Sequence, residues 1–107
     1  MSKGHDATLG IIIRYDIEAD KAEIRTNVKR EKVADLLGEY LHTIVGEGKD
    51  TAPSEEREVY EISLMLDLAN DAWSTKHDCG NKGLREGIIM AVLALLRDRP
   101  GKVEWTS

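Results

Sequence analysis

Side chains that can take part in chemistry are concentrated in one short stretch of the sequence, residues 76–85. The candidate ligand-binding residues of this stretch are His77, Asp78, Cys79, Asn81, Lys82 and Arg85. Gly80 and Gly83 lie among them, and glycine lets the backbone approach a ligand closely. Because the first amides of a helix have no partner within the helix, a stretch just before a helix can bind an anion such as phosphate. The stretch lacks the glycine spacing and the Ser or Thr of a Walker motif, so we prefer the simpler interpretation of a polar loop between two helices.

The single cysteine, Cys79, is the one candidate nucleophile beside a histidine and an acid. A reactive thiolate needs a nearby cation or a helix start, and catalytic partners are normally brought together by the fold rather than by adjacency. We therefore assign no catalytic residue. A metal at His77 and Asp78 would need further ligands from elsewhere in the chain, so we predict neither a metal nor a cofactor. One cysteine cannot form an intramolecular disulfide, which favours a reducing compartment.

The charge balance restricts the classes of partner. With 15 Lys and Arg against 20 Asp and Glu, the net charge is -5, which disfavours nucleic acid. Residues 21–32 are mainly basic and residues 50–67 mainly acidic, and two such patches can steer one subunit onto another. The longest apolar run, 88–96, is about half of what a membrane span needs, and no export signal is visible at the start. We expect a cytoplasmic protein without a membrane segment.

The spacing of apolar residues predicts the elements that hold these side chains. Apolar residues at alternate positions from Leu9 predict a β-hairpin over about 9–28. Spacings of three and four predict helices over about 28–46 and 54–74. The apolar run 88–96 is too long for a typical strand and contains no Gly or Pro, which predicts a helix over about 83–99, and a short strand is expected at 102–106. No internal repeat is visible. We predict a single α+β domain spanning residues 1–107, a hairpin with a possible third strand packed on three helices.

The third predicted helix is apolar on all sides and must be covered on all sides. A symmetric dimer supplies that cover, and its interface residues would be Ile88, Ile89, Val92 and Leu96. The sequence therefore favours a small non-enzymatic interaction or regulatory module that forms a homodimer and binds a protein partner. The alternative is an enzyme that acts on a small ligand or phosphate, or uses a metal, through residues 76–85.

Overall fold

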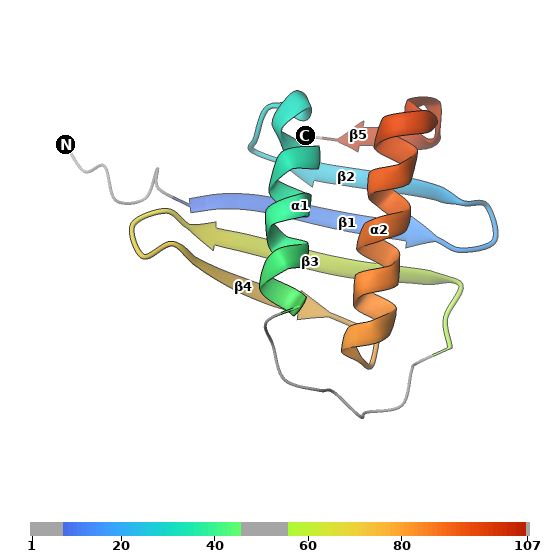
Figure 1. The fold of residues 1–107 in the computed structure, drawn as a ribbon. Helices are drawn as coiled ribbons and strands as arrows, with labels where there is room; N and C mark the ends of the chain where they lie inside the picture. Colours follow the sequence, from blue (N-terminus) through green and yellow to red (C-terminus); the bar gives the residue numbers. More distant parts are fainter. Residues whose placement is uncertain (1–7, 46–55, 107) are drawn as a thin grey trace.

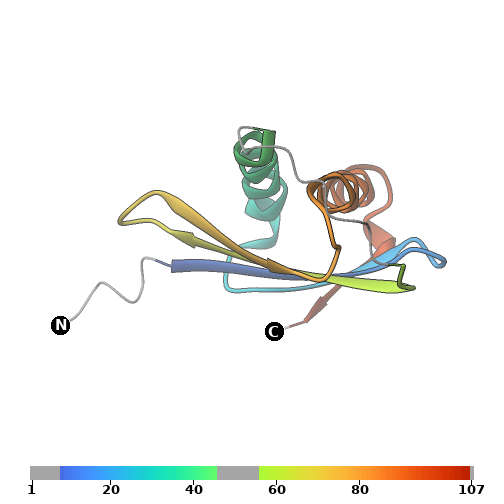
Figure 2. The same ribbon diagram turned by 90° about the horizontal axis from the view of Figure 1, so that it is seen from below.

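Five strands form one mixed sheet, and two helices lie on one of its faces (Figures 1 and 2). The computed structural model describes residues 8–45 and 56–106. Along the chain the elements are β1 (Thr8–Asp16), β2 (Lys21–Thr26), α1 (Arg30–Val45), β3 (Val59–Asp67), β4 (Ala72–His77), α2 (Lys82–Asp98), the short 3-10 helix η2 (Pro100–Lys102) and β5 (Val103–Thr106). The sheet order is β4-β3-β1-β2-β5. Neighbouring strands are antiparallel, except that β5 runs parallel to β2.

The core lies between the sheet and the two helices. Every second residue of β1, β2 and β3 faces the helices, as the period of a strand requires. The buried residues on the strands are Ile11, Ile13, Tyr15, Ala22, Ile24, Tyr60, Ile62, Leu64, Leu66 and Val103. The helices contribute Val33, Leu37, Tyr40 and Ile44 from α1 and Ile88, Ile89, Val92 and Leu95 from α2. The buried apolar groups of residues 8–45 and 56–106 therefore lie on one side of the sheet.

The predicted packing of a hairpin on three helices is wrong, although the α+β class is consistent with the structure. Apart from residues 54 and 55, which lie outside the described residues, the helix expected over 54–74 is replaced by β3, a turn and the first part of β4. Its apolar residues fit both periods, because Ile62, Met65 and Leu66 are spaced by three and four while Ile62, Leu64 and Leu66 alternate. Pairing of all nine residues of β3 with β1 settles the conflict in favour of the strand. Met65 then falls on the opposite face and is 50% exposed.

The structure contains an internal repeat that the sequence does not reveal. The bounds of β3 and β4 lie 51 residues after those of β1 and β2, and each hairpin is followed by a helix. The turns also correspond, because Asp20 and Asp71 adopt φ values of 53° and 51° in the left-handed region. Over 8–28 and 59–79 only three aligned pairs are identical, so the two halves share their backbone and little of their sequence.

A pseudo-twofold axis relates the two halves. Ile12 pairs with Ser63, its own counterpart 51 residues later, so the axis passes through this pair in the middle of the sheet. The two helices run in opposite directions across the strands, as such an axis requires (Figure 1). Strand β5 breaks the symmetry, because it extends the sheet beside β2, while β4, the equivalent of β2, is the last strand on its side among the described residues. Neither of the described helices has the length and apolar character needed to cross a membrane.

Candidate functional site

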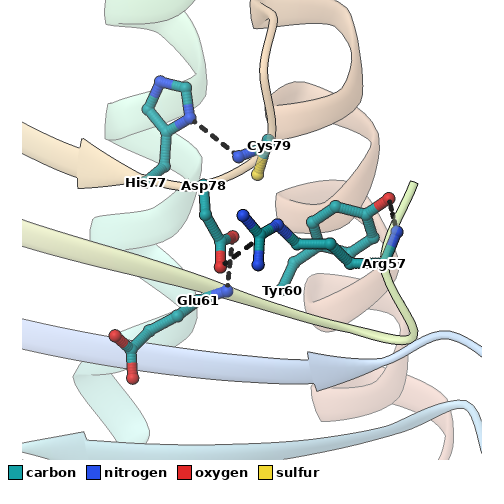
Figure 3. A network of polar contacts seen from close by, with 6 residues as sticks. All are labelled: Arg57, Tyr60, Glu61, His77, Asp78 and Cys79. Atoms are coloured by element: carbon teal, nitrogen blue, oxygen red, sulfur yellow. Dashed lines mark hydrogen bonds and ion pairs between the residues drawn. The ribbon is translucent and has the colours of Figure 1, made fainter. Parts of the chain in front are cut away.

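The predicted ligand-binding stretch forms the corner between β4 and α2. His77 ends β4, and Asp78 and Cys79 follow before α2 begins at Lys82. The backbone N–H of Cys79 donates to Nδ1 of His77 at 3.2 Å (Figure 3). This contact orients the imidazole along the backbone of the corner, and the structure brings His77, Asp78 and Cys79 together as neighbours in one turn.

Cys79 is fully buried, and its thiol is not activated. Burial is the main reason that its pKa rises from 9.0 to about 11, and the carboxylate of Asp78 adds to that rise. The guanidinium of Arg85 acts in the opposite direction without overcoming the burial. At neutral pH the side chain is therefore a protonated thiol within the core, which is unlike the low-pKa thiol of a cysteine nucleophile.

Asp78 joins the end of β4 to the start of β3. Its Oδ1 accepts from the backbone N–H of Glu61 at 2.9 Å, and its own N–H donates to the carbonyl of Glu61 at 3.3 Å. Nε of Arg57 lies 3.9 Å from Oδ2 of Asp78, and the backbone N–H of Arg57 donates to the hydroxyl of Tyr60 at 3.0 Å (Figure 3). The carboxylate of Asp78 thus holds two segments of the sheet at a fixed spacing.

Two of these hydrogen bonds recur at the equivalent corner of the first half. Oδ1 of Asn27 accepts from the backbone N–H of Gly10 at 2.9 Å, as Asp78 accepts from Glu61. Oγ1 of Thr26 accepts from the backbone N–H of Val28 at 3.0 Å, as His77 accepts from Cys79. Two corners with different side chains make the same backbone contacts, so these contacts belong to the fold. The chemistry-bearing residues of 77–79 therefore have a structural role that Thr26, Asn27 and Val28 fill in the other half.

The remaining predicted ligand residues begin α2. Oδ1 of Asn81 accepts from the backbone N–H of Leu84 at 2.8 Å, which caps the helix. Lys82 is half-buried in the first turn, and Arg85 is only 7% exposed. Within the described residues, no group of three or more His, Cys, Asp or Glu side chains is arranged to hold a metal ion.

The predicted interface residues on α2 face inward. Ile88, Ile89 and Val92 are buried in the core of this chain, and Leu96 is half-buried against it. Met90 lies on the opposite side of α2 and is 57% exposed. The helices and the sheet thus cover most of the apolar surface for which a partner subunit was expected, and the homodimer itself stays a prediction.

Figure 2 shows both helices on one side of the sheet, and we name the opposite side the bare face. The bare face carries ordered rows of charged residues that sequence reasoning missed. Strand pairing places the following residues next to one another across the sheet, in what we name the basic row: Lys76, Ser63, Ile12, Arg25 and Thr106. The next row, which we name the acidic row, contains Glu61, Arg14, Glu23 and Glu104. The alternation in 9–17 already placed Arg14 on this face. The partners from β3 and β4 were hidden by the predicted helix.

The two rows line a hollow on the bare face. Its volume is about 220 Å³, and its lining includes Ile12 and Ser63, the pair on the pseudo-twofold axis. In the lining of the hollow, Nη1 of Arg14 lies 3.9 Å from Oε1 of Glu23, an ion pair between neighbouring residues of β1 and β2. The other charged residues of the rows are exposed. The face therefore offers both signs of charge around a partly apolar centre.

Comparisons with known proteins do not identify a family. No family model matches the sequence, no curated protein matches it, and no solved structure matches it.

Proposed function

We propose that this chain is a non-enzymatic interaction module that forms a homodimer through the bare face of its sheet. The observation that supports this proposal is the basic row lying directly beside the acidic row. Two adjacent rows of opposite sign form a self-complementary surface, which a symmetric dimer requires, because the same patch must serve both subunits.

The arrangement of the rows favours one dimer geometry. A twofold axis parallel to the rows, midway between them, sets the basic row of one subunit against the acidic row of the other. This axis leaves positions along the rows unchanged, so β2 of one subunit faces β2 of the other. Arg25 of the basic row then lies opposite Glu23 in the acidic row of the second copy. Strands of the two subunits run antiparallel, which is compatible with the aligned packing of two sheets. Ile12 and the half-exposed Met65 add apolar surface to the interface.

Light scattering with size-exclusion chromatography tests the proposal. We expect a mass of twice the 12.0 kDa chain, falling to the single chain as salt rises from about 0.05 M to about 1 M, because screened charges lose their attraction. Arg25→Glu places like charges opposite Glu23 at two symmetric positions and should weaken the dimer by about tenfold or more.

Lys32→Glu is the matched control, because it makes the same change of charge at an exposed position on α1, away from the bare face. This variant should keep the mass of the parent. A parent chain that stays at 12.0 kDa at high concentration and low salt would refute the proposal, and so would an Arg25→Glu variant that dimerises as tightly as the parent.

A further inference from the structure

The internal repeat contains two equivalent strands, β2 and β4, whose outer edges differ. The edge of β2 is covered by β5, whereas β4 is the last strand of the described sheet on its side. We propose that the outer edge of β4 binds an extended segment of a partner protein. This segment runs parallel to β4, with apolar side chains at alternate positions and an acidic side chain between them.

Strand β5 is the template for this docking. It pairs with β2 in parallel, with Val103 beside Ala22 and Trp105 beside Ile24. Val103 is buried by this pairing, and the ring of Trp105 lies 5.3 Å from the guanidinium carbon of Arg30. A four-residue strand with two apolar side chains thus already extends the first hairpin of this chain, at the outer edge of β2.

The pseudo-twofold axis transfers this register to β4. Trp73 replaces Ala22 and Thr75 replaces Ile24, so the apolar side chains of the incoming strand lie beside Trp73 and Thr75. Trp73 is half-buried, with its ring tilted against Tyr40 at a centroid distance of 5.3 Å. The exposed part of the indole gives the incoming strand an apolar contact at the edge of the core.

The charges at the edge of β4 determine which side chain of the incoming strand fits best between its two apolar residues. On β5 that side chain is Glu104, which lies directly opposite Glu23, and like charges in opposed positions weaken strand pairing. The position on β4 equivalent to Glu23 is Ser74, and the exposed Lys76 lies two residues further on the same face. An acidic side chain therefore fits β4 better than it fits β2.

The backbone of β4 supplies the remaining interactions. In an edge strand every second residue directs its N–H and C=O away from the sheet, where another strand can pair with them. Residues 72–77 contain no proline, which is one of the residues that block such pairing. Docking by strand addition takes its affinity from these backbone bonds and its specificity from alternate side chains.

The test uses the full chain and a peptide based on β5. The probe is PGKVEFT, the sequence of residues 100–106 with Phe in place of Trp105, so that the indole signals come only from the protein. Binding is followed by NMR. We expect saturable binding in which every second amide of β4 becomes protected from exchange and the indole resonance of Trp73 shifts, while the amides of β2 and β5 keep their protection.

Paired variants distinguish peptide binding at the edge of β4 from dimerisation through the bare face. Lys76→Glu should lower the affinity for the peptide by about tenfold. A peptide with Lys in place of its Glu should bind this variant with the affinity that the parent has for the original peptide. Arg25→Glu is the matched control, because Arg25 is the counterpart of Lys76 in the basic row but lies on the strand whose edge β5 covers. It should bind the peptide like the parent, even where it dissociates the proposed homodimer, so the two proposals fail independently.

Three outcomes would overturn the β4 site. The first is an absence of binding at about 1 mM peptide. The second is protection that changes at β2 and β5 instead of β4, which would mean that the peptide displaces β5. The third is an equal loss of affinity for the peptide in Lys76→Glu and Arg25→Glu.

Discussion

Raising the pH should destabilise this protein through Cys79, and the size of the effect follows from its burial. The folded state raises the pKa of the thiol from 9.0 to about 11, so the folded chain holds this proton more tightly than the unfolded chain. The stabilisation is therefore complete below about pH 9 and is lost as the pH rises through about 11. A difference of about 2 pH units corresponds to about 2.7 kcal/mol, of which about 1 kcal/mol disappears between about pH 9 and 10.

Cys79→Val is the appropriate comparison, because Val28 occupies the equivalent position in the first half of the repeat. Urea unfolding at a series of pH values gives the free energy of unfolding for both chains. Their difference should change by about 2.7 kcal/mol between about pH 8 and 12. The comparison also cancels Tyr15, whose pKa is raised to about 12 by burial and by its hydrogen bond to Asp20.

Two results would refute this reasoning. Parallel pH curves for the parent and Cys79→Val would mean that the thiol does not titrate differently in the folded state. Rapid alkylation of the native chain by iodoacetamide at about pH 7 would mean that the thiol is exposed or activated, as a nucleophile would be. A slow reaction that speeds up only on unfolding agrees with a buried thiol.

Further substitutions test the two corners, the turns and the core, each by urea unfolding. Asn27→Ala and Asp78→Ala should each cost about 1 kcal/mol, because equivalent corners lose equivalent backbone contacts; a loss at only one corner would contradict the repeat. Asp71→Gly should stabilise the chain by about 0.5 kcal/mol, since glycine adopts a positive φ without strain. Asp20→Gly should destabilise it instead, because its carboxylate accepts a 2.6 Å hydrogen bond from a tyrosine hydroxyl. Val92→Glu should unfold the chain by burying a charge; a folded monomer would show that this position is accessible.

Local periodicity located several elements of the fold. Alternation from Leu9 led to the first hairpin, the three and four spacing led to the helix at 30–45, and the long apolar run 88–96 led to the helix at 82–98. The prediction of a helix was wrong for 59–73, because the apolar residues of this segment fit both the strand period and the helix period over a short length. Ile62 and Leu66 serve a strand and a helix equally well until pairing with β1 decides between them. The error hid half of the sheet and with it the two rows of charge.

The predicted ligand stretch shows a second limit. Residue types alone cannot distinguish a reactive group from one with a structural role. His77, Asp78 and Cys79 make hydrogen bonds to the backbone at the second corner. Thr26, Asn27 and Val28 make the equivalent hydrogen bonds at the first. The equivalence is visible only in the bounds of the strands and in the hydrogen bonds of the two corners. Three identities in 21 aligned positions are too few to show it in the sequence.

The sequence by itself determined the charge balance, the single thiol, the α+β class and the local periods, since each depends on residue type and near neighbours. The tertiary structure decided which period 59–73 follows, where Arg25 and Lys76 lie and that β4 ends the described sheet. These properties depend on strand pairing between residues far apart in the chain. The energy of such pairing comes from contacts that no local window contains.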